Sequence, residues 1–150
     1  MIKLARIICP TDFSPTSTRA SEYAATMAEA FGAELVLLHV IPVMDYPLRS
    51  FGMSASFHHI QEELETRAEE SLKVRMAELQ KALPKLKVRP LVAHGEAHVA
   101  TLECAKKESA DMIVLGTHGH TGITHALLGS TAEKVVRLST CPVTTVRTPG

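Results

Sequence analysis

The chain has 150 residues, of which 45% are apolar and 21% charged, a composition typical of a folded globular protein of one domain. Its 16 Lys and Arg balance 16 Asp and Glu, so there is no overall positive field to attract nucleic acid or an anionic membrane. Trp is absent and aromatic residues make up 4% of the chain, which leaves little for stacking single-stranded nucleic acid. We therefore expect a single domain, residues 1–150, that binds neither nucleic acid nor membrane.

The lack of a targeting signal and the placement of the cysteines both favour a reducing compartment. The first residues lack the apolar stretch of a signal peptide, and no window approaches the ~20 apolar residues that a membrane-spanning helix needs. Cys9, Cys104 and Cys141 form no C-x-x-C pair and lie in or beside apolar segments, which indicates buried, reduced thiols. We expect a cytoplasmic protein.

The N-terminal part predicts a strand followed by an amphipathic helix. Leu4–Cys9 is apolar in character, as in a strand that is covered on both faces. Ser17–Phe31 has helical periodicity, with Ser14 or Thr16 available as the N-cap and Gly32 as the C-terminal stop. The expected buried stripe of this helix comprises Ala20, Tyr23, Ala24, Met27, Ala28 and Phe31.

The middle of the chain predicts a strand, an irregular connection and a long helix. Glu34–Ile41 is a second buried strand, ended by Pro42, and residues 42–59 lack any periodicity. Ile60–Leu83 predicts a long surface helix that ends before Pro84. Its apolar residues recur at steps of three and four: Ile60, Leu64, Ala68, Leu72, Met76, Leu79 and Leu83.

The same alternation of strands and helices continues to the end of the chain. The expected elements are a strand over Lys87–Ala93, a helix over Glu96–Ser109, a strand over Asp111–Gly116, a helix over Ser130–Ser139 and a strand over Pro142–Arg147. Five strands alternating with four helices imply right-handed crossovers and a parallel sheet between two helix layers. The predicted fold is α/β, a doubly wound five-stranded parallel sheet with helices on both faces.

In such a sheet, ligands bind beyond the carboxyl ends of the strands, where the winding reverses. The loop at residues 10–15 follows the first predicted strand and contains Asp12. A carboxylate in this place can accept hydrogen bonds from a ribose or help to hold a hydrated divalent cation. Capping of the following helix or turn explains Asp12 equally well.

The loop after the fourth predicted strand contains two features that favour anions. Gly116, Gly119 and Gly122 follow one another at steps of three, which permits close backbone approach and a concave row of N–H groups. Gly129 and Ser130 then open a helix, whose unpaired N–H groups and positive dipole end favour a phosphate. A glycine-punctuated turn followed by an ordinary N-cap is the structural alternative.

Neither familiar nucleotide loop is present. A Walker A motif needs a lysine, and none stands between Lys107 and Lys134; the dinucleotide motif needs G-x-G-x-x-G after the first strand. The glycine loop offers histidines but no Lys, Arg or carboxylate, so binding is better supported than turnover. His94 and His98 lack further ligands at zinc spacing, so we expect no dedicated metal site. His39 follows an apolar run and is expected to be a hydrogen-bonded core histidine.

Four segments together resemble the universal stress protein family. They are IICPTDFS, LLHV, GTHGHTGITHALLGS and CPVTTVR. The third fits the pattern of the ATP-binding branch of the family: Gly, two residues, Gly, nine residues, Gly, then Ser or Thr. The resemblance covers the whole chain and implies the strand order 3-2-1-4-5, with a pocket at the junction of the first and fourth strands. This is where the two unusual loops meet.

The resemblance also implies a ligand and the residues that hold it. The ligand is ATP, or ADP or AMP, with magnesium or manganese held mainly by the phosphates. The implied positions are Pro10, Thr11 and Asp12 on the ribose side, Val40 against adenine through its backbone, Leu115, Gly116, His118 and Gly119 beside the ribose and phosphates, and Gly129, Ser130 and Thr131 on the phosphates.

The family further implies a homodimer through the C-terminal strand, Pro142–Arg147, and a role as a nucleotide-dependent stress-response regulator or chaperone-like factor. Two alternatives remain open. One is a nucleotide-independent dimeric interaction protein of the same fold. The other is a slow ATPase, or a protein that phosphorylates itself on Ser130 or Thr131 because these residues lie close to phosphate.

Overall fold

The computed structural model describes residues 1–43, 54–118 and 128–148, which form one parallel sheet of five strands and four helices. The elements are β1 (Arg6–Pro10), α1 (Pro15–Phe31), β2 (Glu34–Ile41), α2 (Ser54–Ala82), β3 (Lys87–His94), α3 (Ala97–Lys107), β4 (Met112–Gly116), α4 (Ser130–Leu138) and β5 (Val143–Val146). The strand order is β3-β2-β1-β4-β5, so the winding reverses between β1 and β4. This confirms the predicted fold class and strand order.

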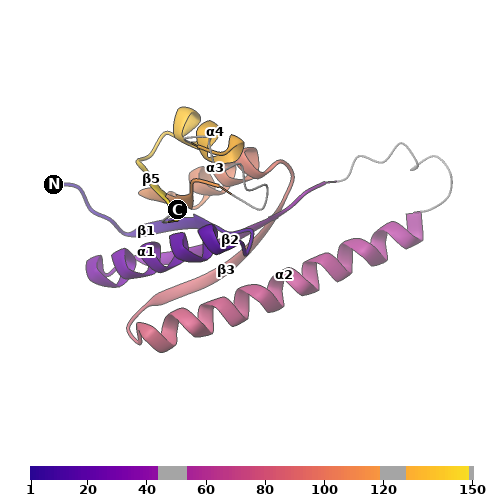
Figure 1. Cartoon of the computed structure of the whole chain (residues 1–150), viewed down its shortest axis with the longest axis horizontal. Helices are drawn as coiled ribbons and strands as arrows, with labels where there is room; N and C mark the ends of the chain where they lie inside the picture. Colours follow the sequence, from indigo (N-terminus) through magenta and orange to yellow (C-terminus); the bar gives the residue numbers. More distant parts are fainter. Residues whose placement is uncertain (44–53, 119–127, 149–150) are drawn as a thin grey trace.

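Two helix layers cover the sheet, α1 and α2 on one face and α3 and α4 on the other (Figure 1). Successive residues of the central strands supply opposite faces: Ile7 and Cys9 pack with α1 and α2, whereas Ile8 packs with α3 and α4. All three side chains are fully buried. This alternation explains the continuously apolar strands, because each face needs its own core.

Helix α1 packs on the sheet through small residues, which include Ala20, Ala24 and Ala28 of the predicted stripe. Ser14 provides the N-cap and Gly32 the left-handed C-cap, with φ of 66°, as expected. The buried side chains are Ser17, Ala20, Ser21, Ala24, Ala25 and Ala28. Tyr23 and Phe31 were predicted on this stripe, but they are 48% and 65% exposed. Small side chains let the helix approach the sheet closely, and this leaves the aromatic rings on the rim.

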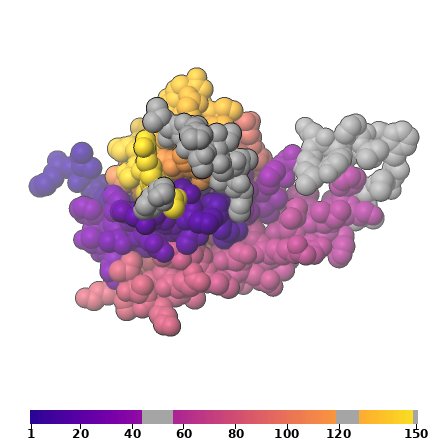
Figure 2. Space-filling model, viewed as in Figure 1, coloured from indigo at the N-terminus to yellow at the C-terminus, as the bar shows by residue number. Residues whose placement is uncertain are grey.

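Helix α2 begins at Ser54, six residues before its predicted start. Its C-terminal half packs on the core through Leu72 and Leu79, whereas Ile60 and Leu64 in the predicted stripe are exposed. Figure 1 shows the N-terminal half of the helix extending beyond the sheet, and in the space-filling view of Figure 2 this part protrudes from the rest of the molecule. Within the described residues, no helix is long and apolar enough to cross a membrane.

The cysteines are free thiols that differ in burial. Cys9 is fully buried, and burial raises the pKa of its thiol to about 12, so it stays protonated and unreactive. Cys104 and Cys141 are only partly buried, so the prediction of buried thiols holds for Cys9 alone.

An ion-pair network joins the amino-terminal parts of β1, β2 and β3 to the carboxyl end of α3, at the end of the sheet opposite to the predicted pocket. Arg6 Nε and Arg89 Nε each donate to the Glu34 carboxylate at 2.8 Å, and Arg89 also pairs with the Glu108 carboxylate. Burial alone raises the pKa of Glu34, but the hydrogen bonds from both arginines outweigh it and hold this pKa below its usual range.

We expect Glu34→Gln to lower the free energy of unfolding by roughly 1–2 kcal/mol at about pH 7. Because the folded pKa is depressed, this stabilisation is present above the unfolded pKa and is lost as the pH falls through the folded pKa. Urea unfolding at about pH 7 and about pH 3 measures the difference, which should shrink at the lower pH. Glu63→Gln, in an exposed pair with Arg67, is the control. An equal cost of Glu34→Gln at both pH values contradicts the prediction.

Candidate functional site

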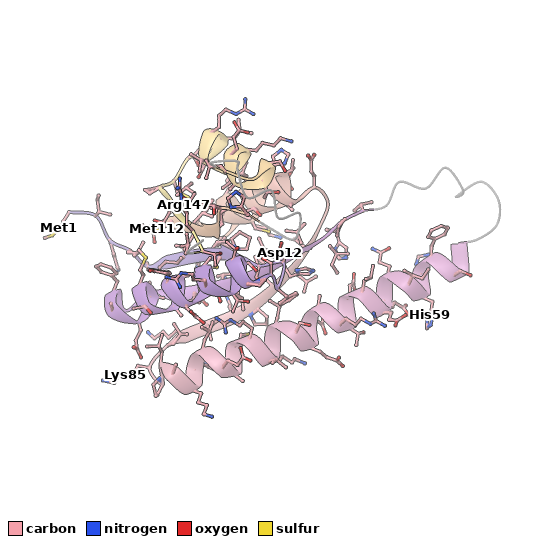
Figure 3. The ribbon with its side chains drawn as sticks, viewed as in Figure 1. Met1, Asp12, His59, Lys85, Met112 and Arg147 are labelled. Atoms are coloured by element: carbon pink, nitrogen blue, oxygen red, sulfur yellow. The ribbon has the colours of Figure 1, made fainter. Side chains whose placement is uncertain are left out.

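A cavity of about 340 Å³ lies at the carboxyl ends of β1 and β4, where the winding of the sheet reverses. Asp12, labelled in Figure 3, lies at this end of the sheet, just before α1 begins. The lining residues are Pro10, Thr11, Asp12, Ser17, His39, Val40, Ala97, Thr101, Leu115, Gly116, Thr117, His118, Gly129, Ser130, Thr131 and Ala132. The cavity is therefore bounded by both loops that the sequence singled out and by the first turns of α3 and α4.

The loop after β1 is shaped by its own polar side chains. Asp12 Oδ1 accepts a hydrogen bond from the Ser14 N–H at 3.0 Å, and Ser14 Oγ accepts from the Ser17 N–H at 3.3 Å to cap α1. The turn function of Asp12 is thus confirmed. The same side chain lines the cavity, so the turn does not exclude contact with a ligand.

Gly116 at the end of β4 allows α1 to approach the sheet. A Cβ at this position would lie 2.8 Å from Thr16 Cγ2 and 3.1 Å from the Thr16 carbonyl carbon. Contacts this close with backbone atoms exclude a larger side chain unless the helix moves. The glycine therefore brings the first turn of α1 close to the cavity.

Gly129 performs a similar role at the start of α4. Its N–H donates to the Thr117 carbonyl at 2.6 Å, and a Cβ here would lie 2.9 Å from that same oxygen. The contact ties the N-terminus of α4 to the end of β4. Since the first N–H groups of a helix have no carbonyl within the helix to bond, those of Ser130 and Thr131 are available on the cavity side. Such N–H groups at the start of a helix can donate hydrogen bonds to an anion.

Ten of the eleven predicted ligand-binding residues line this one cavity. They are Pro10, Thr11, Asp12, Val40, Leu115, Gly116, His118, Gly129, Ser130 and Thr131. The eleventh, Gly119, lies outside the described residues. His118 Nδ1 is 3.0 Å from Thr117 Oγ1, so its ring is held at the edge of β4. The structure brings the described residues together; their contacts with a ligand stay predictions.

Sequence reasoning missed six of the lining residues: Ser17, His39, Ala97, Thr101, Thr117 and Ala132. His39 is hydrogen-bonded, as predicted, since its Nδ1 is 2.7 Å from the Thr11 carbonyl oxygen. It is only half-buried, however, and it reaches the cavity from the end of β2. The signal that could have found it is its place beside Val40 at a strand end.

The described lining of the cavity carries few charged side chains. Among the described lining residues none is Lys or Arg, and Asp12 is the only carboxylate. The described residues also contain no cluster of three or more metal-ligating side chains. His94 Nε2 lies 2.7 Å from Glu65, and His98 Nδ1 lies 3.3 Å from Glu96. The polar groups of the cavity therefore fit a small molecule that carries both hydroxyls and an anionic group.

Comparison with known proteins identifies the family of this chain. The model of the universal stress protein family matches residues 3–147. The chain belongs to the universal stress protein family. The universal stress protein MJ0531 of Methanocaldococcus jannaschii is 35% identical over 146 residues, which cover 96% of this chain and 82% of that protein.

Solved structures show the same fold. Universal stress protein UspA from Lactobacillus plantarum has a TM-score of 0.86 at 21% identity, covering 98% of this chain and all of that one. A universal stress protein in complex with cAMP has a TM-score of 0.69 at 24% identity, covering 99% and 100%. The Archaeoglobus fulgidus universal stress protein in complex with dAMP has a TM-score of 0.63 at 19% identity, covering 97% and 99%. Some proteins of this fold therefore bind nucleotides.

Proposed function

We propose that this universal stress protein binds an adenine nucleotide, ATP or else ADP or AMP, in the cavity between β1 and β4, and that the nucleotide controls its action as a stress-response regulator or chaperone-like factor. The observation that carries the proposal is that Asp12 and the N-terminus of α4 border one cavity. Its volume of about 340 Å³ is within the range of small-molecule sites. The cAMP and dAMP complexes of the two fold relatives support an adenine ligand.

Each side of the cavity suits one part of that ligand. The Asp12 carboxylate accepts hydrogen bonds from the ribose hydroxyls, with Pro10 and Thr11 beside it. The backbone at Val40 meets adenine at the end of β2. The N–H groups at the start of α4 donate to phosphate oxygens. In this arrangement the attraction for phosphate comes from backbone dipoles, which the count of Lys and Arg does not register.

The donor set also fits a magnesium or manganese ion carried by the nucleotide. Mg²⁺ in nucleotide sites is usually held by one or two carboxylates, by phosphates and by water. The described lining offers one carboxylate, Asp12, and the hydroxyls of Ser130 and Thr131. Asp12 would hold the ion through water or directly, while the phosphates supply most of its ligands.

Isothermal titration of the full chain with ATP, ADP and AMP in the presence of magnesium tests the proposal. We expect one site per chain for at least one of the three, and weaker binding of GTP at the same concentration. Absence of binding of all three contradicts the proposal and favours a nucleotide-independent interaction protein. Steady phosphate release that Asp12→Ala abolishes would instead support the slow ATPase.

We also propose that the protein is a cytoplasmic homodimer that forms through β5. A cytoplasmic location is consistent with its three free thiols. β5 pairs with β4 on one side only and so leaves an edge of the sheet. The Pro142 carbonyl accepts from Ile113 in β4, and the Val146 carbonyl accepts from Thr117 directly after β4. Alternation along a parallel strand therefore directs the Thr144 N–H toward β4 and the Thr145 N–H toward the free edge.

We expect Thr145→Pro to weaken the dimer by about tenfold or more, because proline removes an N–H from the free edge and leaves the β4 ladder intact. Light scattering at micromolar concentration measures the mass. Thr144→Pro is the matched control: it removes an N–H that faces β4 and should lower the stability of the chain instead. A wild-type monomer under these conditions contradicts the dimer.

A further inference from the structure

The loop that carries Asp12 adopts a backbone conformation that needs support. Phe13 has a φ of 62°, a left-handed conformation that residues with a side chain rarely adopt. Such conformations persist only where the surrounding structure holds them. Within the loop, the Phe13 N–H donates to Thr11 Oγ1 at 3.0 Å and the Ser14 N–H donates to Asp12 Oδ1 at 3.0 Å. These bonds fold the loop, but they do not fix it to the sheet.

The end of β2 supplies the attachment. The Thr11 N–H donates to the Leu38 carbonyl at 2.7 Å, and His39 Nδ1 lies 2.7 Å from the Thr11 carbonyl oxygen. The ring of Phe13 also packs on the His39 ring, with 4.8 Å between the centroids. Two consecutive residues of β2 therefore hold both backbone groups of Thr11, and one of them also contacts the left-handed residue.

The bond from His39 fixes a whole peptide plane. A carbonyl oxygen can only accept, so Nδ1 of His39 carries a proton and donates it in both the neutral and the charged ring. In a planar trans peptide the C=O of Thr11 and the N–H of Asp12 point in opposite directions. Fixing the Thr11 carbonyl therefore fixes the direction of the Asp12 N–H and the backbone from which the Asp12 side chain leaves.

We propose that His39 is a positioning residue of the nucleotide site, which presents Asp12 to the ligand by holding the Thr11 carbonyl through Nδ1–H. This inference rests on the proposed function and deepens it. An aliphatic side chain of similar size could fill the same space, but it would leave the Thr11 carbonyl without its donor. The proposed role needs a hydrogen-bond donor at one position of the side chain. The loss of this donor can therefore be distinguished from a loss of packing.

Two amide side chains separate these roles. In asparagine the amide nitrogen is bonded to Cγ, as Nδ1 is in histidine, so His39→Asn can still donate to Thr11. In glutamine the amide lies one bond farther out, near the place of Nε2. We expect His39→Gln and His39→Leu to weaken ATP binding about tenfold, and His39→Asn to restore it to within about threefold of wild type. His94→Asn, on a histidine that pairs with Glu65 and does not line the cavity, is the control.

Hydrogen exchange of the full chain without nucleotide tests the loop independently of binding. We expect the amides of Phe13 and Ser14 to exchange about tenfold faster in His39→Gln and His39→Leu than in wild type and His39→Asn, since both amides are bonded inside the loop that His39 holds. Amides of the central strand β2 should exchange at the same rate in all variants. Unfolding of a variant would show in β2 as well, so it cannot be mistaken for loop opening.

The outcomes are distinct. Wild-type affinity in His39→Leu, or no restoration by asparagine, overturns the inference, as does unchanged exchange at Phe13 and Ser14. A wild-type affinity that rises several-fold from about pH 8 to about pH 6, with no rise in His39→Asn, would show a direct charged contact through Nε2 and overturn it too. A wild type that binds no adenine nucleotide overturns the proposed function, and the exchange experiment then still decides whether His39 holds the loop.

Discussion

Gly129→Val reduces ATP binding at least about a hundredfold, because two N–H bonds to phosphate of roughly 1.5 kcal/mol each are lost together. The reason is steric. A Cβ at Gly129 meets the Thr117 backbone oxygen at 2.9 Å, so the start of α4 must move away from β4. The N–H groups of Ser130 and Thr131 move with it. Isothermal titration of the variant measures the loss.

Two controls separate this effect from a general loss of stability. Gly32→Ala disturbs the left-handed C-cap of α1, at the amino end of β2 and far from the cavity, so it should destabilise the chain and leave the affinity unchanged. Ser130→Ala removes a hydroxyl but keeps the N–H, and should cost only a few-fold. Wild-type affinity in Gly129→Val would show that the N-terminus of α4 does not hold the phosphates. Gly119→Val is likewise predicted to weaken binding, but Gly119 lies outside the described residues.

Asp12→Ala weakens ATP binding by about a hundredfold, whereas Asp12→Asn costs about tenfold. Alanine removes the ligand contact together with the turn bond to the Ser14 N–H. Asparagine keeps an oxygen for the turn and loses the charge that favours ribose hydroxyls and the cation. Titration of both variants gives the order of affinities, wild type above Asp12→Asn above Asp12→Ala.

The comparison of the two Asp12 variants also separates the role of Asp12 in the turn from its contact with the ligand. Equal losses in both variants would assign the effect to the charge alone. Full affinity in Asp12→Asn and a large loss in Asp12→Ala would assign it to the shape of the loop. Wild-type affinity in both contradicts the placement of Asp12 in the nucleotide site.

The inner strands of the sheet were predictable because they are buried on both faces. Leu35–Leu38 is a continuous apolar run within β2, and both ends of β2 fall where the sequence predicts them. The helices were less predictable, because periodicity does not tell which apolar residues reach the sheet. On α1 the small residues face the core and Tyr23 is exposed. On α2 residues 58–61 are exposed, so no apolar pattern marks the start at Ser54.

The cavity was largely predictable because parallel strands end on the same edge of the sheet. The family resemblance implies that the first and fourth strands are neighbours, so the loops after β1 and β4 were expected to meet, and Asp12 and Gly129 do line one cavity. His39 was assigned to the core because a histidine that follows an apolar run looks the same in sequence whether or not it reaches a cavity. Its half-buried side chain and its place in the lining of the cavity distinguish the two.

A crystal structure of this chain with ATP and magnesium would test the proposed nucleotide site. We expect the nucleotide in the cavity between β1 and β4, with phosphate oxygens on the N–H groups at the start of α4 and the ribose beside Asp12. Adenine should lie against the end of β2 at Val40. Nucleotide bound elsewhere on the molecule, or a cavity that stays unfilled at saturating ATP, would contradict it.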